Sequence, residues 1–256
     1  MSSSDTAVTT HVVGDVRWIV FDRPAKLNAL TRADIAEISR LVADPGPSVR
    51  ALAFTGAGDR AFSAGIHTAT FVDLDPPEAR AFIEQLRDCL ALVRTSPLPT
   101  AAVVNGYCLG AAFELALVCD LRLSTPDSSF GLPEVKVGIP SVIDAALLSA
   151  HVGLAFAKEM ILTGDPYPVA AMYRLGLLNR VAPAGRLVRE TTGLLARITR
   201  HTPVVLASQK RLFEIWQNRG LADAIDDSVD EFAAVFAHPE TMEQIRAAPG
   251  SGPRPR

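Results

Sequence analysis

The chain has 256 residues, of which 48% are hydrophobic and 21% are charged, a composition typical of a folded globular protein and not of a disordered one. Its 25 basic and 28 acidic side chains leave a net charge of −3, which argues against binding to a nucleic-acid backbone. A chain of this length forms one large domain or two small ones, and it buries enough surface to fold without metal ions or disulfides.

The first half of the chain predicts alternating strands and helices. In chain order we expect a strand pair or one bent strand at 12–21, a helix at 32–43, a strand at 49–55, a loop at 56–60, a helix at 77–93, a strand at 100–104, a helix from 110 to about 118 and a strand at 121–124. Thr31 is a good N-cap for the first of these helices. This alternation is typical of an α/β protein.

From residue 145 onward the pattern is mostly helical. Helices are predicted at 145–152, 154–162, 169–175, 186–200, 204–217 and 221–237. The change in pattern predicts a core over 1–200 and a helical region over 201–246. The stretch 247–256 is rich in Pro, Gly and Arg, and we expect it to be a disordered tail.

Residues 95–113 carry no charged side chain, and by length they could cross a membrane. The run contains two prolines, Asn105 and Gly110, and it leads directly into Glu114, so we interpret it as buried core and expect no membrane association. The N-terminal residues lack the apolar stretch of a secretory signal. Three cysteines without a CxxC pair then indicate free thiols in a reducing cytoplasm.

Several common site motifs are absent or incomplete. Residues 56–61 match a relaxed GxGxxA dinucleotide fingerprint after a strand, but Gly65 interrupts the helix that this motif requires. The sequence has no GxxxxGK[ST], GxSxG or HExxH motif. Its five histidines show no ligand spacing with each other or with cysteine, so we expect no metal site.

Two glutamates stand out because their neighbours are apolar. Glu114 lies in the first turn of an otherwise apolar helix, where it either simply complements the helix dipole or is desolvated for chemistry. Glu134 lies in a loop, where it either pairs with Lys136 or an arginine, or faces a site. Desolvated carboxyl groups have raised pKa values and suit proton transfer near neutral pH.

Two backbone segments have the features of an oxyanion hole. Small residues at Ala64 and Gly65 let the main chain approach a ligand closely. A helix that begins after Gly110 leaves the Ala111 N–H without an intrahelical acceptor. Two such N–H groups that converge on one point would stabilise negative charge on a carbonyl oxygen.

These residues lie within a series of short motifs that occur in a fixed order. The motifs are Arg23-Pro24 with Asn28-Ala29-Leu30, Ala61-Phe62-Ser63-Ala64-Gly65, Asn105-Gly106-Tyr107 leading through Gly110 to Glu114, Cys119-Asp120, Phe130-Gly131 with Pro133-Glu134, and Gly176-Leu177 with Asn179-Arg180-Val181. From about residue 12 to residue 236 the chain therefore resembles the crotonase family of enoyl-CoA hydratases and isomerases.

The resemblance implies a crotonase-like spiral of ββα units, with C-terminal helices that pack between the subunits of a homotrimer or of a hexamer built as a dimer of trimers. It implies an acyl-CoA thioester as ligand and no cofactor beyond the coenzyme A of the substrate. By position, the N–H groups of Ala64 and Ala111 match the oxyanion hole, and Glu114 and Glu134 match the two acids of the hydratases.

The reaction implied is addition of water across the C2–C3 double bond of a 2-enoyl thioester. We assign Glu114 to hold and activate the water, and Glu134 to orient it and deliver the proton to C2. The residues matched to substrate or CoA binding are Lys26, Leu27, Ala64, Gly65, Ile66, His67 and Gly110. Lys26 is equally well explained as a solvated surface lysine.

The chain departs from the family's pattern after Glu134. The family usually has Gly-Gly-Thr-Gln-Arg-Leu there, whereas this chain has Gly138 to Leu147, and we expect Val142, Ile143 and Asp144 to reshape the acyl pocket. Two alternatives to a hydratase stay open. One is a Δ3,Δ2-enoyl-CoA isomerase or another crotonase reaction that uses Glu134, and the other is a non-catalytic acyl-CoA-binding protein on the same fold.

Overall fold

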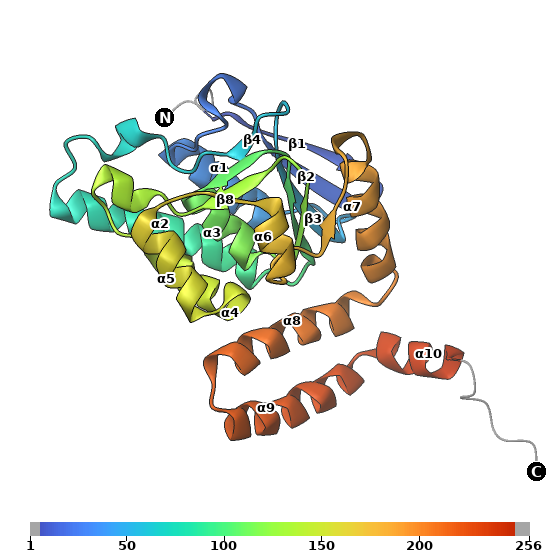
Figure 1. Ribbon diagram of the computed structural model, residues 1–256. Helices are drawn as coiled ribbons and strands as arrows, with labels where there is room; N and C mark the ends of the chain where they lie inside the picture. The colour runs from blue at the N-terminus through green and yellow to red at the C-terminus, as the bar shows by residue number, and fades with distance from the viewer. Residues whose placement is uncertain (1–5, 249–256) are drawn as a thin grey trace, which may run out of the picture.

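A computed structural model describes residues 6–248 and shows two β-sheets surrounded by helices (Figure 1). The larger sheet has the order β1 (Val8–Val13), β2 (Val16–Phe21), β3 (Ala51–Gly56), β5 (Thr100–Val104), β7 (Leu121–Ser124) and β10 (Arg180–Val181). The smaller sheet has the order β4 (Ala61–Ser63), β6 (Tyr107–Leu109), β8 (Ser129–Gly131) and β9 (Tyr167–Pro168). All neighbouring strands are parallel except the pairs β1–β2 and β8–β9.

Ten α-helices and five short 3-10 helices connect and cover these sheets over residues 6–248. The α-helices are α1 (Arg32–Ala43), α2 (Pro76–Arg94), α3 (Ala111–Val118), α4 (Leu148–Val152), α5 (Leu154–Thr163), α6 (Val169–Arg174), α7 (Ala184–Thr199), α8 (Pro203–Asn218), α9 (Leu221–Ala234) and α10 (Pro239–Ala247). The 3-10 helices are η1 (Pro24–Lys26), η2 (Thr68–Phe71), η3 (Glu134–Val137), η4 (Ile143–Leu147) and η5 (Val235–Ala237).

A repeated unit of two strands and a helix builds the spiral. β3, β4 and α2 form one such unit, and β5, β6 and α3 form the next, so that each turn adds one strand to each sheet. The predicted α/β spiral is confirmed. The helix predicted at 32–43 is also confirmed, and its N-cap Thr31 forms a capping box with Asp34.

Other predictions needed adjustment. Residues 12–21 form an antiparallel pair that begins earlier, at Val8. The helix predicted at 145–152 is the 3-10 helix η4 followed by α4. The helix predicted at 221–237 changes to 3-10 geometry at Val235, and α10 was not predicted. Of the expected tail, residues 249–256 lie outside the described part of the chain.

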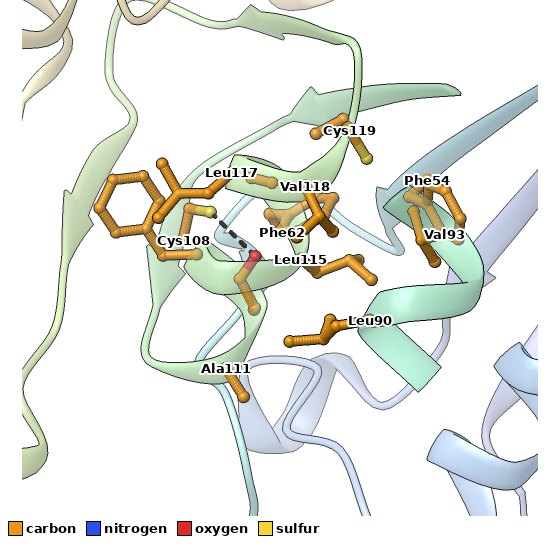
Figure 2. Packing of buried hydrophobic residues seen from close by; sticks show 14 of the residues in the cluster. Phe54, Phe62, Leu90, Val93, Cys108, Ala111, Leu115, Leu117, Val118 and Cys119 are labelled. Carbon is orange, nitrogen blue, oxygen red and sulfur yellow. Dashed lines mark hydrogen bonds between the residues drawn. The ribbon is translucent and has the colours of Figure 1, made fainter. Parts of the chain in front are cut away.

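Most of the charge-free run 95–113 is buried, although Thr95, Pro97 and Tyr107 are exposed. All five residues of β5 and all eight residues of α3 are buried. Figure 2 shows how Leu90 and Val93 of α2 face Leu115 of α3 across this core. Within residues 6–248, no helix is both long and apolar enough to cross a membrane.

The three cysteines lie in the same core. Cys89, Cys108 and Cys119 are all buried and unpaired. The Cys108 thiol donates to the Ala112 carbonyl oxygen at 3.6 Å, the dashed line in Figure 2. Burial raises the pKa of Cys89 to about 11, raises that of Cys119 to about 12 and also raises that of Cys108, so all three remain thiols at neutral pH.

Helices α8, α9 and α10 extend beside the spiral as an arm, coloured orange to red in Figure 1. The arm is joined to the core by an ion pair in which Lys210 Nζ of α8 lies 2.6 Å from Asp120 Oδ2, which also accepts from the Thr100 N–H and hydroxyl. Several large apolar side chains of the arm are exposed: Phe213, Trp216, Leu221, Ile225, Val229, Phe232, Phe236 and Ile245.

Candidate active site

A cavity of about 190 Å³ lies where the N-terminus of α3 meets η3 and the turn before η4. Glu114 and Glu134 both line it, so the fold brings the two predicted acids to one space. The other predicted residues on its wall are Ala64, Ile66, Gly110, Ala111, Val142 and Ile143. Most of the remaining wall is apolar, with Phe71 from η2 and Ile83 and Leu86 from α2.

The start of α3 depends on a glycine in an unusual conformation. Gly110 has φ 56° and ψ −134°, which an L-residue adopts only under strain. Because α3 begins after it, the Ala111 N–H has no acceptor among the described residues. Gly65 has φ 86° and lies close by, since a Cβ at Gly65 would stand 3.3 Å from the Ala111 nitrogen.

The structure changes the predicted partner of Ala111 in the oxyanion hole. The Ala64 N–H, which was predicted for this role, donates to the Leu27 carbonyl oxygen at 2.9 Å and is therefore occupied. Leu30 forms an isolated parallel bridge with Ile66, using the Gly65 carbonyl and the His67 N–H, both at 2.8 Å. In such a bridge the Ile66 N–H points the other way, and it has no acceptor within residues 6–248.

Ile66 was matched to substrate binding in the sequence, but its N–H was not singled out there. Which N–H group of this segment stays free depends on which main-chain groups form hydrogen bonds with Leu30. That pairing joins segments with no strand pattern of their own, so no sequence signal marks it. The free N–H groups of Ile66 and Ala111 are thus the pair of donors that the geometry offers.

Glu114 lines the cavity and is buried, with only 3% of its surface exposed. Its Oε2 has no hydrogen-bond partner among the described residues. Burial, and then the nearby charges of Glu134 and Asp144, raise the pKa of Glu114 well above that of an ordinary glutamate. Favourable interaction with the helix dipole therefore does not by itself explain why Glu114 is at this buried position.

Glu134 lies at the start of η3, where its carboxylate accepts a hydrogen bond from Ser141 and lies close to Gly110. The Ser141 hydroxyl donates to Glu134 Oε2 at 2.7 Å. Glu134 Oε1 lies over Gly110, where a Cβ would come within 2.6 Å of it. Lys136, the expected partner in the non-catalytic interpretation, instead pairs with Asp165 at 2.5 Å. The Glu134 carboxylate is therefore directed to the cavity beside the start of α3.

The other predicted residues do not line this cavity. Lys26 is exposed at the end of η1, and Leu27 holds the Ala64 N–H. His67 caps η2 by accepting the Ala69 N–H at Nδ1, 3.3 Å away. Asp144, predicted for the acyl pocket, is absent from the cavity wall, and its carboxylate lies against Arg94. Within residues 6–248, no cluster of three or more His, Cys, Asp or Glu could hold a metal ion.

Paired acids beside two free N–H donors are an arrangement that can move a proton and stabilise charge on a carbonyl oxygen. Residues 13–247 match the family model described as enoyl-CoA hydratase/isomerase, and the chain belongs to this family.

Known proteins of similar sequence or structure agree with this membership. Crotonyl-CoA hydratase of Syntrophomonas wolfei is 31% identical over 236 residues, which cover 90% of this chain and 89% of that protein. Among solved structures, an enoyl-CoA hydratase subunit of Geobacillus kaustophilus has a TM-score of 0.88 at 31% identity, covering 94% of both chains. DspI of Pseudomonas aeruginosa has a TM-score of 0.89 at 27% identity, covering 96% of this chain and 95% of that one.

Proposed function

We propose that this chain is an enoyl-CoA hydratase that adds water across the C2–C3 double bond of a 2-enoyl-CoA thioester. The observation that carries the proposal is the presence of Glu114 and Glu134 on one cavity beside the free N–H groups of Ile66 and Ala111. The similarity to a crotonyl-CoA hydratase along most of the chain supports it.

In this proposal the thioester oxygen accepts hydrogen bonds from Ile66 and Ala111. When water oxygen attacks C3, the electrons of the double bond move toward C2 and the thioester, and negative charge develops on this oxygen. The N-terminal end of α3 points its dipole at that charge. A preorganised donor of this kind contributes about 3 kcal/mol to the transition state, and the fold holds both donors in place before the substrate arrives.

The two acids carry out the proton transfers of the same step. We assign Glu114 to activate the water, because a base whose pKa is raised by burial accepts a proton more readily near neutral pH. Glu134, fixed through its Oε2 by Ser141, orients the same water and gives its own proton to C2. The proton that Glu114 takes from the water then passes to Glu134, so the net change is one hydroxyl group on C3 and one proton on C2. The product is a 3-hydroxyacyl-CoA, and no cofactor other than the coenzyme A of the substrate takes part.

The acyl chain and the coenzyme A part of the substrate would contact other residues than the two acids. The apolar wall formed by Ile66, Phe71, Ile83, Val142 and Ile143 suits the acyl chain. We place Lys26, Leu27, Gly65 and His67 on the side that approaches coenzyme A, since the Leu27 carbonyl ties this segment to the cavity wall at Ala64.

We also propose an assembly and a location. The exposed apolar side chains of the arm would pack between subunits of a homotrimer, or of a hexamer built as a dimer of trimers. This gives the arm, within residues 201–246, a role separate from the core at 1–200. Three buried thiols and the absence of any disulfide within residues 6–248 support a cytoplasmic location. Light scattering coupled to gel filtration tests the assembly.

The function is tested by supplying crotonyl-CoA and following loss of the conjugated double bond and formation of 3-hydroxybutyryl-CoA. Glu114→Gln and Glu134→Gln are each expected to lower kcat by about 10²-fold or more. Glu190→Gln, at an exposed position of α7, is the matched control and should keep wild-type activity.

Two outcomes would replace the proposal by another function of the same site. Turnover of 3-enoyl substrates alone, with Glu114→Gln without effect, would identify an isomerase that uses Glu134. Binding of acyl-CoA without turnover of 2-enoyl or 3-enoyl thioesters would identify a non-catalytic binding protein.

A further inference from the structure

Three charged side chains connect the cavity wall to the C-terminal arm. Asp144 follows Ile143, which lines the cavity, and Asp144 Oδ1 lies 3.6 Å from Nε of Arg94, the last residue of α2. Arg94 also donates from Nη1 to Oε2 of Glu214 in α8. The three residues come from η4, α2 and α8, so an ionic path runs from the substrate cavity to the arm.

The turn that carries Asp144 is strained. Ile143 has φ 44°, a left-handed conformation that is unfavourable for a β-branched residue. Such strain persists only where neighbouring contacts hold the chain in place. Here the flanking residues supply these contacts, since Ser141 donates to Glu134 on one side and Asp144 faces Arg94 on the other.

Asp144 also acts directly on Glu114. Its negative charge disfavours the ionised form of Glu114 and raises the pKa of that acid, whereas its main-chain N–H favours the ionised form. The other charged group that acts on Glu114 is Glu134 of η3, and Arg94 of α2 acts on Asp144. Because η4 also packs against α3, the helix that carries Glu114, a displacement of η4 changes the surroundings of this acid and its proton affinity.

We propose that Asp144 and Arg94 are positioning residues for hydration: the Asp144–Arg94–Glu214 network holds the η4 turn against Glu114 and so couples this acid to the arm. This inference rests on the proposed function of Glu114. The proposal assigns a role to the segment from Gly138 to Leu147, which departs from the family's usual sequence. Asp144 then acts from outside the acyl pocket, since it does not line the cavity.

Four variants test the proposal in the full chain with crotonyl-CoA. Arg94→Met is expected to lower kcat about tenfold with little change in KM, because the substrate wall remains but the acid is misplaced. Arg94→Lys should restore part of the loss, and Glu214→Gln should lower kcat in the same direction but less. Arg87→Met is the control, since Arg87 is exposed on the same helix and forms its ion pair with the exposed Asp88, away from the Asp144–Arg94–Glu214 network.

Asp144→Asn separates charge from shape, because it keeps the main-chain N–H and removes the carboxylate. With Glu114 acting as a base, loss of this charge lowers its pKa, and the acid limb of the kcat/KM profile moves to lower pH. The double variant Asp144→Asn/Arg94→Met should lose no more than the worse single variant, since both act through one contact.

The outcomes distinguish the two proposals. A wild-type chain that does not hydrate crotonyl-CoA refutes the proposed function. An active wild type whose folded Arg94 and Asp144 variants keep the wild-type kcat and acid limb refutes only the coupling. A fall in kcat that follows the melting temperature, with no movement of the acid limb in Asp144→Asn, would also overturn it, because the network would then be merely structural.

Discussion

Replacing Gly110 by alanine should separate the position of Glu134 from the integrity of the fold. A Cβ at this position would stand 2.6 Å from Glu134 Oε1, whereas ordinary contacts begin near 3.4 Å, so the carboxylate must retreat by about 0.8 Å. A displacement of this size in a catalytic group costs about 10²-fold in rate. The backbone conformation of Gly110 adds a stability cost of about 1–3 kcal/mol for alanine.

The assay for Gly110→Ala is steady-state hydration of crotonyl-CoA together with thermal unfolding. We expect kcat to fall about 10²-fold and the melting temperature to fall by a few degrees. Gly153→Ala is the matched control, because Gly153 also has a positive φ, 83°, but no atom lies within 4 Å of its added Cβ.

Gly153→Ala should therefore lose stability and keep its kcat. If Gly110→Ala unfolds at the same temperature as Gly153→Ala and retains the wild-type kcat, Glu134 does not act from its position beside Gly110.

Three further changes have distinct readouts. Ser141→Ala should lower kcat by up to about tenfold with KM unchanged, because Glu134 loses its hydroxyl donor. Ile143→Gly should be more stable to urea than Ile143→Ala by about 1 kcal/mol, since only glycine tolerates the positive φ; equal stabilities would mean that the turn is not strained. Although burial opposes it, hydrogen bonds led by that from Arg23 lower the pKa of Asp34. This carboxylate therefore contributes stability at neutral pH that is lost as the pH falls through its lowered pKa. Asp34→Asn should be less stable at pH 7 and should flatten the loss of stability towards acid, which urea unfolding across pH measures.

Much of the fold could be predicted because local signals agree with it. The helix at 32–43 has a capping residue, a 3.6-residue apolar period and a Pro-Gly stop, and α1 has these bounds. The helix that carries Glu114 could be placed because Gly110 ends one segment and an apolar stretch follows it. Short strands such as β9 and β10 have two residues each, too few for any periodic pattern, and only the neighbouring strands define them.

The site was predictable only in part, for a related reason. Glu114 and Glu134 stood out because each is an acid among apolar residues. The N–H of Ala64 looked available because the sequence does not show that the Leu27 carbonyl reaches it. The link between Asp144, Arg94 and Glu214 joins three distant segments through side chains that look like ordinary surface charges. Hydrogen bonds and ion pairs of this kind follow from the completed fold and have no local signature.

The three buried thiols allow transient opening of the core to be measured by chemical labelling. Only a thiolate attacks a disulfide reagent, and burial both shields Cys89, Cys108 and Cys119 and raises their pKa values. In native buffer labelling should therefore be slow and limited by transient exposure of the interior. Because α2 carries Cys89 and α3 begins and ends beside Cys108 and Cys119, labelling rates of single-cysteine variants would show whether these two helices open together or separately.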